Sequence, residues 1–585
     1  MKRPVRESGV LPAAAEFDYR DDGSIYVRSP RPLGPYPAKI TERLEFWAER
    51  AGDRTFLAQR GPDGQWQRLT YREALTRVRR AAQGLLDRNL SAERPIAILS
   101  GNSIEHAVFA LAALYTGVLY SPIAPAYSLA STDFTTLREI WDTLRPALVF
   151  AESAAFDRAI EAVAPEGVER ISSCTALESA DAGPAVNCAH AKVGPDTVAK
   201  ILFTSGSTGH PKGVINTQRM LCSNQEMIRA ALPCLAEEPP VLCDWLPWNH
   251  TFGGNHNFGI ALFNGGTLYI DEGRPAANQF ARTIENLREI PTTAYFNVPK
   301  GYEMLVSALR DDETLRRTFF SRVRIVFYAA AGLRQKVWDD LQDLAYQTCG
   351  EEILMITGLG STETGPAAVF TSREGASAGR IGLPVPGVEL KVAPVGQRLE
   401  ARVRGPNVTP GFWNDDVRTR AAFDEEGFYR MGDAVRLADA SDPLQGFLFE
   451  GRIAEDFKLS TGTWVCVESV RSRLLSHFGD TLQDAVIAGP DRHYVSALVF
   501  PARRASREEL QNLLNEFASG STGVSTCVAR ILLLGDPPSA DAREVTAKGN
   551  LNQKAVLENR AALVEELYAE PRSPHVIEVT EEISK

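Results

Sequence analysis

Short apolar runs alternate with helix-like segments along much of this chain. Apolar residues recur at i, i+3 and i+4 over residues 72–89, which predicts an amphipathic helix, and residues 96–99 follow as a short buried strand. The alternation continues with a helix over about 104–116 and strands over about 117–121, 147–150 and 323–327. Because strands that are separated by helices form parallel, doubly wound sheets, the sequence predicts an α/β fold.

The chain has 585 residues, which is too long for one hydrophobic core and indicates several domains. Turn-forming Pro and Gly residues alternate with strand-like runs such as 389–392 over about 380–450, which predicts a β-rich subdomain. The run 446–452 then leads into a segment with a different, mixed pattern. We therefore expect a large N-terminal domain over residues 1–451 and a small α+β domain over residues 452–585.

Composition and charge are those of an ordinary soluble globular protein. Hydrophobic residues make up 44% and charged residues 23% of the chain, and the net charge of −11 argues against a nucleic-acid partner. The eight cysteines form no C-x-x-C pair, which indicates reduced thiols in a cytoplasmic protein and no structural zinc. The most apolar stretch, 106–126, is interrupted by Gly and Pro before the ~20 residues that a membrane span needs, so we expect no integral membrane segment. The sequence leaves the oligomeric state open.

A loop rich in glycine and hydroxyl residues carries the clearest chemical signal. Residues 204–213 read Thr-Ser-Gly-Ser-Thr-Gly-His-Pro-Lys-Gly, directly after the apolar run 199–203. Glycines let a backbone approach a phosphate closely, and backbone N–H groups, hydroxyls and the ammonium of Lys212 can then surround the anion. The sequence therefore predicts a polyphosphate-binding loop, with a flexible Gly/Ser linker as the alternative. The predicted contacts are Thr204, Ser205, Gly206, Ser207, Thr208, Gly209 and Lys212.

This loop differs from a Walker loop in its chemistry. A Walker loop ends in Gly-Lys-Ser/Thr, whose hydroxyl binds magnesium and whose next residues open a helix. Here Pro211 precedes the lysine and Gly213 follows it. Because proline lacks an N–H and has a fixed φ, we expect the chain to stay extended at Pro211.

The loop resembles the phosphate-binding signature of the AMP-forming acyl-CoA synthetases, a superfamily shared with luciferases and peptide-synthetase adenylation domains. Residues 358–365 resemble the aromatic-Gly-x-Thr-Glu motif of that family, 428–433 its Gly-Asp motif and 451–452 the start of its hinge. The resemblance extends over roughly residues 45–560. It implies ATP, CoA and Mg²⁺ as cofactors and a mobile C-terminal domain that rotates between an adenylating and a thioester-forming arrangement, with a pivot around 453–455.

The resemblance also implies roles for individual residues. Glu363 would bind Mg²⁺, and Thr362 would donate to the α-phosphate of ATP. Asp433 would accept from the ribose hydroxyls, and Arg452 would contact the ribose or a phosphate. His250 would line the acid pocket and gate it. The remaining predicted nucleotide and CoA contacts are Ala331, Gly332, Ser361 and Gly462.

Each of these assignments has a structural alternative. Asp433 can be a turn or capping residue, and Glu363 can be a charge at a helix N-terminus. Arg452 can be an ion-pair partner between domains, and His250 can be a core histidine whose hydrogen bonds are satisfied. The segment 328–333, which resembles the strand end beside adenine and substrate, can be ordinary strand packing.

The C-terminal lysine motif departs from the family pattern. That pattern is roughly Thr-x-x-Gly-Lys-Ile-x-Arg, and its lysine reaches the carboxylate and the α-phosphate during adenylation. Residues 546–554 read Thr-Ala-Lys-Gly-Asn-Leu-Asn-Gln-Lys, so that Asn550 takes the lysine position. Lys548 lies two residues earlier, on the same face of an extended strand, and is our predicted catalytic lysine; Lys554 is the alternative. Leu359 likewise replaces the aromatic residue expected to stack on adenine.

Three segments indicate which enzymes within this superfamily the chain resembles. Residues 248–257, 455–464 and 546–553 resemble feruloyl-CoA synthetases. The predicted function is therefore an ATP-dependent acid:CoA ligase that acts on ferulate or a related hydroxycinnamate through an acyl-adenylate. The predicted acid pocket comprises His250, Phe252, Gly253, Asn255, Phe258, Ala330 and Leu359. A fatty-acyl-CoA ligase, an enzyme that loads a carrier protein and a catalytically silent nucleotide-binding protein are the alternatives.

Overall fold

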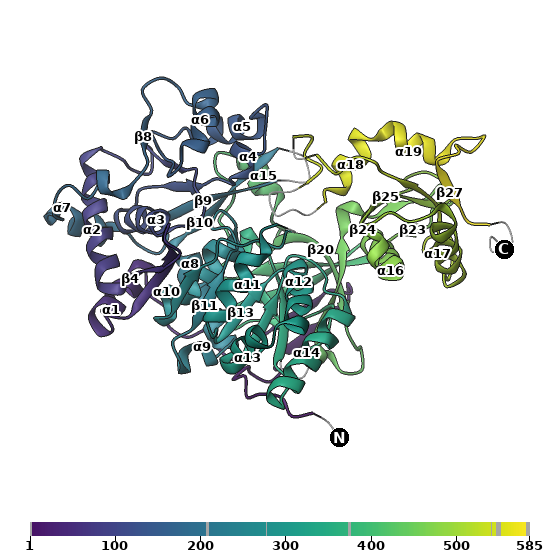
Figure 1. Ribbon diagram of the computed structural model, residues 1–585, viewed down its shortest axis with the longest axis horizontal. Helices are drawn as coiled ribbons and strands as arrows, with labels where there is room; N and C mark the ends of the chain where they lie inside the picture. Colours follow the sequence, from purple (N-terminus) through teal and green to yellow (C-terminus); the bar gives the residue numbers. More distant parts are fainter. Residues whose placement is uncertain are drawn as a thin grey trace.

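The computed structural model describes residues 3–205, 210–276, 278–372, 376–539, 541–545 and 551–580. Figure 1 shows a large body that contains α1 to α15 and a smaller unit, built from α16 to α19 and the last strands, at one side of it. The fold is mixed α/β, as the sequence predicts.

The first sheet of the large body has six strands in the order β10-β9-β6-β5-β7-β8. All neighbouring strands are parallel except the β9–β10 pair, which is antiparallel. This order, with the chain moving outward from β5 in both directions, is the predicted doubly wound arrangement. The strands are β5 (Ile96–Ile98), β6 (Tyr120–Pro122), β7 (Leu148–Phe150), β8 (Glu169–Ile171), β9 (Val198–Ser205) and β10 (Pro211–Thr217).

The helices that cover this sheet agree with the periodicity in the sequence. Helix α2 (Tyr71–Asp87) begins at a capping box in which Thr70 and Glu73 bond reciprocally. Helix α3 (Ile104–Thr116) has the predicted bounds and ends at Gly117, whose φ of 74° suits a glycine. Strand β6 starts at Tyr120, later than the predicted 117, because the left-handed cap at Gly117 delays the return to extended backbone.

The largest sheet has eleven strands and runs through the middle of the body. Strands β13, β14 and β15 are parallel, and the strands of the β-rich stretch continue the same sheet in antiparallel pairing through β16 and β17. An N-terminal hairpin, which the sequence analysis did not anticipate, adds β2 to β18. The strands are β1 (Glu16–Tyr19), β2 (Ile25–Arg28), β13 (Ala294–Asn297), β14 (Ile325–Tyr328), β15 (Leu354–Gly360), β16 (Ala367–Phe370), β17 (Arg380–Pro384), β18 (Glu389–Val395), β19 (Arg398–Arg404), β20 (Tyr429–Leu437) and β21 (Phe447–Arg452).

A third sheet completes the body in the order β11-β12-β3-β4. Its strands are β3 (Thr55–Arg60), β4 (Trp66–Thr70), β11 (Val241–Asp244) and β12 (Thr267–Ile270). The large body also contains the helices α4 (Ala126–Leu129), α5 (Thr135–Leu144), α8 (Gln218–Ala231) and α10 (Phe258–Asn264).

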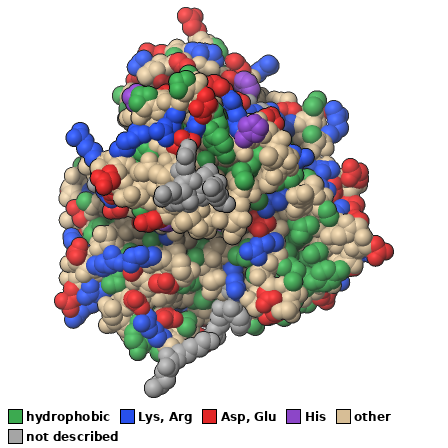
Figure 2. All heavy atoms as spheres, turned by 90° about the vertical axis from the view of Figure 1, so that its right-hand side faces the viewer, with side chains coloured by type: hydrophobic (Ala, Val, Ile, Leu, Met, Phe, Trp, Pro, Cys, Tyr) green, Lys and Arg blue, Asp and Glu red, His purple; other side chains and the backbone are tan. Residues whose placement is uncertain are grey.

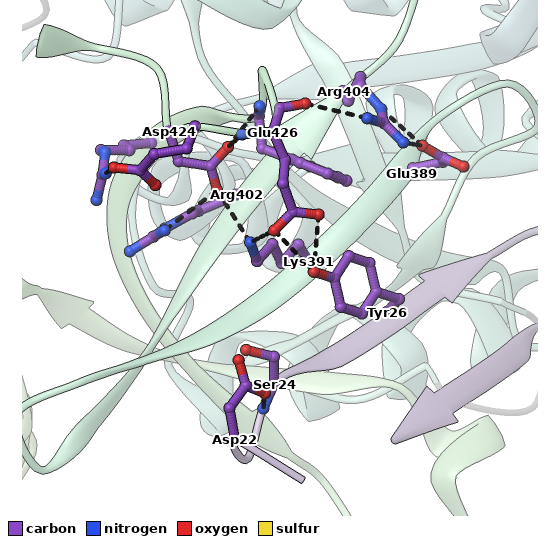
Figure 3. A network of polar contacts seen from close by, with 12 residues as sticks. Asp22, Ser24, Tyr26, Glu389, Lys391, Arg402, Arg404, Asp424 and Glu426 are labelled. Atoms are coloured by element: carbon purple, nitrogen blue, oxygen red, sulfur yellow. Dashed lines mark hydrogen bonds and ion pairs between the residues drawn. The ribbon is translucent and has the colours of Figure 1, made fainter. Parts of the chain in front are cut away.

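A network of charged side chains lies beside β18, β19 and β20 (Figure 3). The Asp424 carboxylate has 0% exposure and accepts hydrogen bonds from Lys391 Nζ and Arg402 Nη1, both at 3.2 Å. Arg402 also pairs with Glu400 at 2.7 Å. Burial opposes ionisation of Asp424, but the hydrogen bonds that it accepts from the Phe428 N–H, Arg402 and Lys391 lower its pKa. Because buried charges need partners, these ion pairs satisfy the carboxylate of Asp424, which lies shortly before β20, the strand that carries Asp433.

The C-terminal unit has its own sheet and its own hydrophobic cores. Its strands are β24 (Leu482–Ala488), β25 (Val495–Pro501), β26 (Val528–Leu533) and β27 (Val576–Glu578), and its helices are α16 (Val467–Phe478), α17 (Arg507–Ser519), α18 (Gln553–Asn559) and α19 (Ala561–Tyr568). The segment thus has the α+β content that the sequence predicts.

Figure 2 shows Lys and Arg side chains interspersed with Asp and Glu over the face that includes this unit, so the charge there is mixed. In the ranges that the structure describes, no helix combines the length and the apolar character that crossing a membrane requires. All eight cysteines lie in these ranges, and none forms a disulfide.

Candidate nucleotide and acid site

The parallel strands β13, β14 and β15 end together at one edge of the large sheet. Asn297, Tyr328 and Thr357 lie side by side in register there. Ligands of open α/β sheets bind outside the carboxyl ends of such strands. The chain leaves β14 through Ala330, whose φ of 77° is rare for a residue with a side chain and marks local strain. Ala330, Ala331 and Gly332 are exposed, so the predicted nucleotide-flanking segment is accessible at this edge.

The predicted phosphate loop connects two paired strands. Strands β9 and β10 are antiparallel, and Lys212 lies opposite Thr204. Strand β10 begins at Pro211, which confirms the extended backbone expected there. The hydroxyl of Thr204 is buried and has no hydrogen-bond partner among the described residues, as a group kept for a ligand would. Residues 206–209, which carry four of the predicted contacts, lie outside the described residues, and the Ser205 side chain is not described.

The loop lysine and the predicted metal ligand are in direct contact. Glu363 lies in the short helix η4 (Thr362–Thr364), which follows β15, and its carboxylate is 2.6 Å from Lys212 Nζ. Burial opposes ionisation of Glu363, yet the charge and hydrogen bond of Lys212 hold its pKa below the ordinary value. A phosphate that binds Lys212 would compete with Glu363, and a divalent cation would replace Lys212 as the counterion of that carboxylate. The contact therefore brings the predicted phosphate-binding lysine and the predicted Mg²⁺ ligand together in one site.

Tyr429 is a neighbour of this pair that sequence reasoning missed. It begins β20, and its pKa is raised by burial first and by the nearby Glu363 carboxylate second. The only available signal was its place inside the 428–433 motif.

The buried carboxylate of Asp433 forms a cross-strand ion pair. Asp433 lies on β20, is 3% exposed and is 3.0 Å from Arg452 Nε at the end of β21. Arg452 Nη1 also donates to the Met431 carbonyl at 2.9 Å, while its side chain stays half-exposed. Asp433 therefore sits within a strand rather than in a turn, and its ion pair with Arg452 joins two adjacent strands. Gly432 N–H donates to Glu400 at 3.3 Å, which links this pair to the network in Figure 3.

The Glu363 carboxylate suits a Mg²⁺ ion that would also bind phosphate oxygens of the substrate. No group of three or more His, Cys, Asp or Glu side chains in the described ranges could hold a metal ion by itself. Mg²⁺ is commonly bound by one or two carboxylates together with phosphate oxygens and water. Glu363 fits this role as a lone buried carboxylate beside the phosphate loop. When bound, the ion would neutralise phosphate charge.

The predicted acid pocket is built around an irregular helix. The six residues Phe252–Asn257 form η3, a π-helical segment that continues into α10. Gly253 is required for its packing, because a Cβ atom there would lie 2.3 Å from the Leu246 carbonyl oxygen. His250 precedes the helix, and its Nδ1 accepts a hydrogen bond from Phe252 N at 3.2 Å. Such π-helical turns are frequent at functional sites.

The residues of this helix face two different environments. Phe252 and His256 lie in an aromatic cluster with Phe327, where their ring centroids are 5.4 to 5.9 Å apart. Asn255 instead donates to Asn216 Oδ1 at 2.8 Å, and Phe258 packs edge-on against Trp248. The predicted pocket residues are therefore divided between an aromatic side, toward β13–β16, and a polar side, toward β9 and α8. Leu359 lies on β15, partly buried, at the edge of the main core.

Gly462 and the C-terminal lysines belong to the smaller unit. Gly462 forms the exposed turn between β22 (Phe457–Lys458) and β23 (Trp464–Val465), with a φ of 82° and open space around it. Lys548 and Asn550 lie outside the described residues, whereas Val545 and Leu551, on either side of them, form a β-bridge. Lys554 is exposed on α18, 3.7 Å from Glu558.

One carboxylate connects the phosphate loop with the C-terminal unit. Glu139 on α5 is 3.0 Å from Arg543 Nη2 and 3.1 Å from Nδ1 of His210, the residue before Pro211. Nearby, Thr132 donates to Asp541 at 2.8 Å through its hydroxyl. In Figure 1, a described part of the chain before α18 lies near α4. These contacts bring the segment that leads to Lys548 against the domain that carries the phosphate loop.

Removing this connection should slow adenylation selectively. We expect Glu139→Gln to reduce the rate of pyrophosphate release about two- to tenfold, because a partly exposed ion pair contributes modestly to an equilibrium between arrangements. Conversion of a synthetic acyl-adenylate and CoA to the thioester should be unchanged. The exchange Glu139→Arg with Arg543→Glu should restore the rate. A double variant as slow as the single variants would show that the ion pair does not matter.

Asp433→Ala should raise the KM for ATP. Loss of a charge-assisted acceptor costs ~1.5–3 kcal/mol, which corresponds to a tenfold to hundredfold increase. Steady-state kinetics with varied ATP would measure it, with Asp442→Ala, an exposed carboxylate between β20 and β21, as the control. Equal KM values for both variants would leave Asp433 with a purely structural role.

Comparison with known proteins agrees with this geometry. The family model described as AMP-binding enzyme matches residues 44–413. The 3-[(3aS,4S,7aS)-7a-methyl-1,5-dioxo-octahydro-1H-inden-4-yl]propanoyl:CoA ligase of Rhodococcus jostii (strain RHA1) is 24% identical, over 78% of this chain and 87% of that protein. The 4-hydroxybenzoate–CoA/benzoate–CoA ligase of Rhodopseudomonas palustris is 27% identical, over 72% and 76%. The solved structure of ATP-bound MatB from Rhodopseudomonas palustris superposes with a TM-score of 0.69 at 21% identity, over 89% of this chain and 99% of that one.

The structural likeness shows the fold, and the family match spans more than half of the chain. AMP-forming CoA ligases use ATP, CoA and Mg²⁺, so the predicted cofactor set is confirmed. Both findings agree with the motifs in the phosphate loop, at Glu363 and at Asp433. The chain therefore belongs to the AMP-binding enzyme family.

Proposed function

We propose that this protein is an acid:CoA ligase that activates a hydroxylated aromatic carboxylic acid, with ferulate or a related hydroxycinnamate as the expected substrate. The contact between Lys212 and Glu363 carries the proposal, because it joins the phosphate loop to a buried carboxylate suited to Mg²⁺. The Asp433–Arg452 pair supplies an acceptor and a cation for the nucleotide at the neighbouring strand ends.

The two steps follow from the chemistry of a carboxylate. A carboxylate is a poor acyl donor, because its leaving group would be oxide. Its oxygen attacks the α-phosphorus of ATP, the bond to the bridging oxygen of pyrophosphate breaks, and an acyl-adenylate forms. The sulfur of CoA then attacks the acyl carbon, the thiol proton leaves to solvent, and AMP departs. Positioning and charge neutralisation by Lys212 and its neighbours supply most of the catalysis in such transfers.

The aromatic cluster supports an aromatic acid. His256 has rings of Phe252, Phe296 and Phe327 around it, with centroids at 5.1 to 5.4 Å. Burial lowers the pKa of His256 to about 4, so this ring is neutral at physiological pH and compatible with an apolar ligand. Such rings favour offset or edge-on contact with an aryl group. One relative is named for 4-hydroxybenzoate and benzoate, which agrees with this substrate class.

A pyrophosphate-release assay with a panel of acids, with and without CoA, tests the proposal. Hydroxycinnamates should release pyrophosphate, and a CoA thioester should accumulate when CoA is present. Preference for long-chain fatty acids would identify a fatty-acyl-CoA ligase. Adenylation without CoA thioester formation would favour a carrier-loading enzyme, and ATP binding without turnover of any acid would favour the silent alternative.

A further inference from the structure

Two buried asparagine side chains hold the segment that follows Glu363. Asn224 Nδ2 donates to the carbonyl oxygen of Ala367 at 2.7 Å and to that of Thr364 at 3.4 Å. Asn407 Nδ2 donates to the same two carbonyls, at 2.9 Å and 2.7 Å. Both asparagines are 0% exposed. The carbonyl of the residue directly after Glu363 therefore has two side-chain donors, which come from different parts of the chain.

Asn224 connects this segment to the strand that carries the phosphate-loop lysine. It lies on α8, which begins directly after β10 ends at Thr217. Its Oδ1 also accepts a hydrogen bond from the Ala367 N–H at 3.1 Å, so the amide exchanges two hydrogen bonds with one residue, as a paired strand does. A carboxylate or an alkyl side chain cannot make both bonds, because the position requires a donor and an acceptor.

Asn407 connects the same segment to the loop that follows β19. In that loop, the Thr409 N–H donates to the Glu363 carbonyl at 2.8 Å, and the Thr409 hydroxyl donates to the Ile215 carbonyl at 2.7 Å. Ile215 lies on β10, three residues after Lys212. The loop is thus bonded to the backbone of both partners of the Lys212–Glu363 pair.

The amide of Asn407 does more than satisfy backbone groups. Its Oδ1 is buried and has no hydrogen-bond partner in the described part of the chain. An unsatisfied buried acceptor costs free energy, and both carbonyls that Asn407 contacts already have a donor in Asn224. The open oxygen therefore offsets part of what the two donations contribute to stability, which favours a positioning role for this side chain.

The ion pair with Lys212 cannot keep Glu363 in place during the reaction. Phosphate binding would draw Lys212 away, and the carboxylate must then stay at the metal position without its salt-bridge partner. The bonds from Asn224 and Asn407 go to backbone carbonyls, so they do not depend on where Lys212 points. Groups of this kind, which orient a metal ligand without touching the metal, contribute strongly to metal affinity.

We propose that Asn224 and Asn407 are positioning residues that hold the Glu363 carboxylate at the Mg²⁺ position while Lys212 binds phosphate. Both act through the backbone next to Glu363. The proposal rests on the proposed function, because it takes Glu363 as the Mg²⁺ ligand, and it adds the residues that determine the metal requirement.

The test is the effect of Mg²⁺ on ATP binding, measured by titration calorimetry without acid or CoA. We expect Mg²⁺ to tighten the binding of ATP to wild type. In Asn224→Ala and in Asn407→Ala this gain should fall about tenfold, the low end of the ~10- to 100-fold cost typical of groups that orient a metal ligand, while ATP binding without Mg²⁺ should change less than about threefold. Asn264→Ala is the matched control, because Asn264 is a buried amide on α10 that donates to the Ile260 carbonyl at 2.9 Å.

Combination with Glu363→Gln separates positioning from a general loss of folding. In that background, neither asparagine substitution should reduce the effect of Mg²⁺ further, because the carboxylate that the asparagines hold is absent. Urea unfolding shows whether each variant folds. Asn407→Ala leaves both donations of Asn224 in place and should fold, so the test does not depend on Asn224→Ala.

Three outcomes would overturn the proposal. They are a gain from Mg²⁺ that is unchanged in both asparagine variants, equal losses of ATP affinity with and without Mg²⁺, and independent effects in the double variants. A Glu363→Gln variant that responds to Mg²⁺ as wild type does would remove the metal ligand and, with it, the proposal. Failure of wild type to release pyrophosphate with any acid would instead count against the proposed function alone, since the calorimetry needs no acid.

Discussion

Replacing Lys548 with alanine should reduce acyl-adenylate formation by ~10²- to 10³-fold and leave thioester formation near the wild-type rate. The carboxylate and the α-phosphate are both anions, and a cation between them offsets their repulsion as they approach. The family resemblance implies that thioester formation uses the other arrangement of the C-terminal domain, so we expect that step not to depend on Lys548. The two half-reactions therefore separate a catalytic role from a general loss of folding.

The measurement is the pair of half-reaction rates, with ATP and acid in one assay and a synthetic acyl-adenylate with CoA in the other. Lys554→Ala is the matched control, because Lys554 is exposed on α18 beside Glu558 and its loss should leave both rates unchanged. If Lys554→Ala stops adenylation and Lys548→Ala does not, the register chosen for this segment is wrong by six residues. If neither lysine matters, a lysine-independent mechanism or the silent alternative gains support.

Elements whose signal is local were predictable from the sequence. Helix α3 has the predicted bounds because Ser103 caps its start and Gly117 ends it, and both signals lie within the segment itself. Strand β10 begins at Pro211 for a similar reason, since proline is compatible with extended backbone. The fold class followed from the same local alternation of strands and helices.

Contacts between distant segments were not predictable. Glu363 and Lys212 were assigned separately, but their ion pair joins residues 151 positions apart, and no pattern in either segment indicates the other. The N-terminal strand β2 pairs with β18 across a still larger separation. Tyr429 reaches Glu363 only because the sheet places the start of β20 beside η4.

The acid pocket shows a second kind of limit. Asn255 and His256 are consecutive in the sequence, and only Asn255 was assigned to the acid pocket. The π-helical turn directs His256 toward Phe296 and Asn255 toward Asn216, so the two side chains serve different spaces. The sequence predicted one pocket for the residues of this segment, whereas the backbone geometry places them in two separate environments.

Glu363→Gln should raise the Mg²⁺ concentration required for half-maximal adenylation at least ~tenfold, because the substitution removes an anionic metal ligand without changing its size. Adenylation rates over a magnesium titration at saturating ATP measure this, with Glu425→Gln, a largely exposed carboxylate, as the control. A titration identical to that of wild type would show that Glu363 is not the ligand and that its contact with Lys212 is structural.

The same variant has a second expected result in the absence of ligands. The pKa of Glu363 is lower in the folded protein than its ordinary value of 4.5, so the charged carboxylate stabilises the fold above pH 4.5. That contribution is lost as the pH falls through the folded-state pKa, where Glu363 takes up a proton and the attraction to Lys212 ends. Wild type should therefore be more stable than Glu363→Gln at pH 7, by ~1–3 kcal/mol for a buried charge-assisted bond, and the two should converge at acid pH. Urea unfolding at several pH values checks the sign, and a stability difference that does not depend on pH would mean that the carboxylate is not charged in the folded protein.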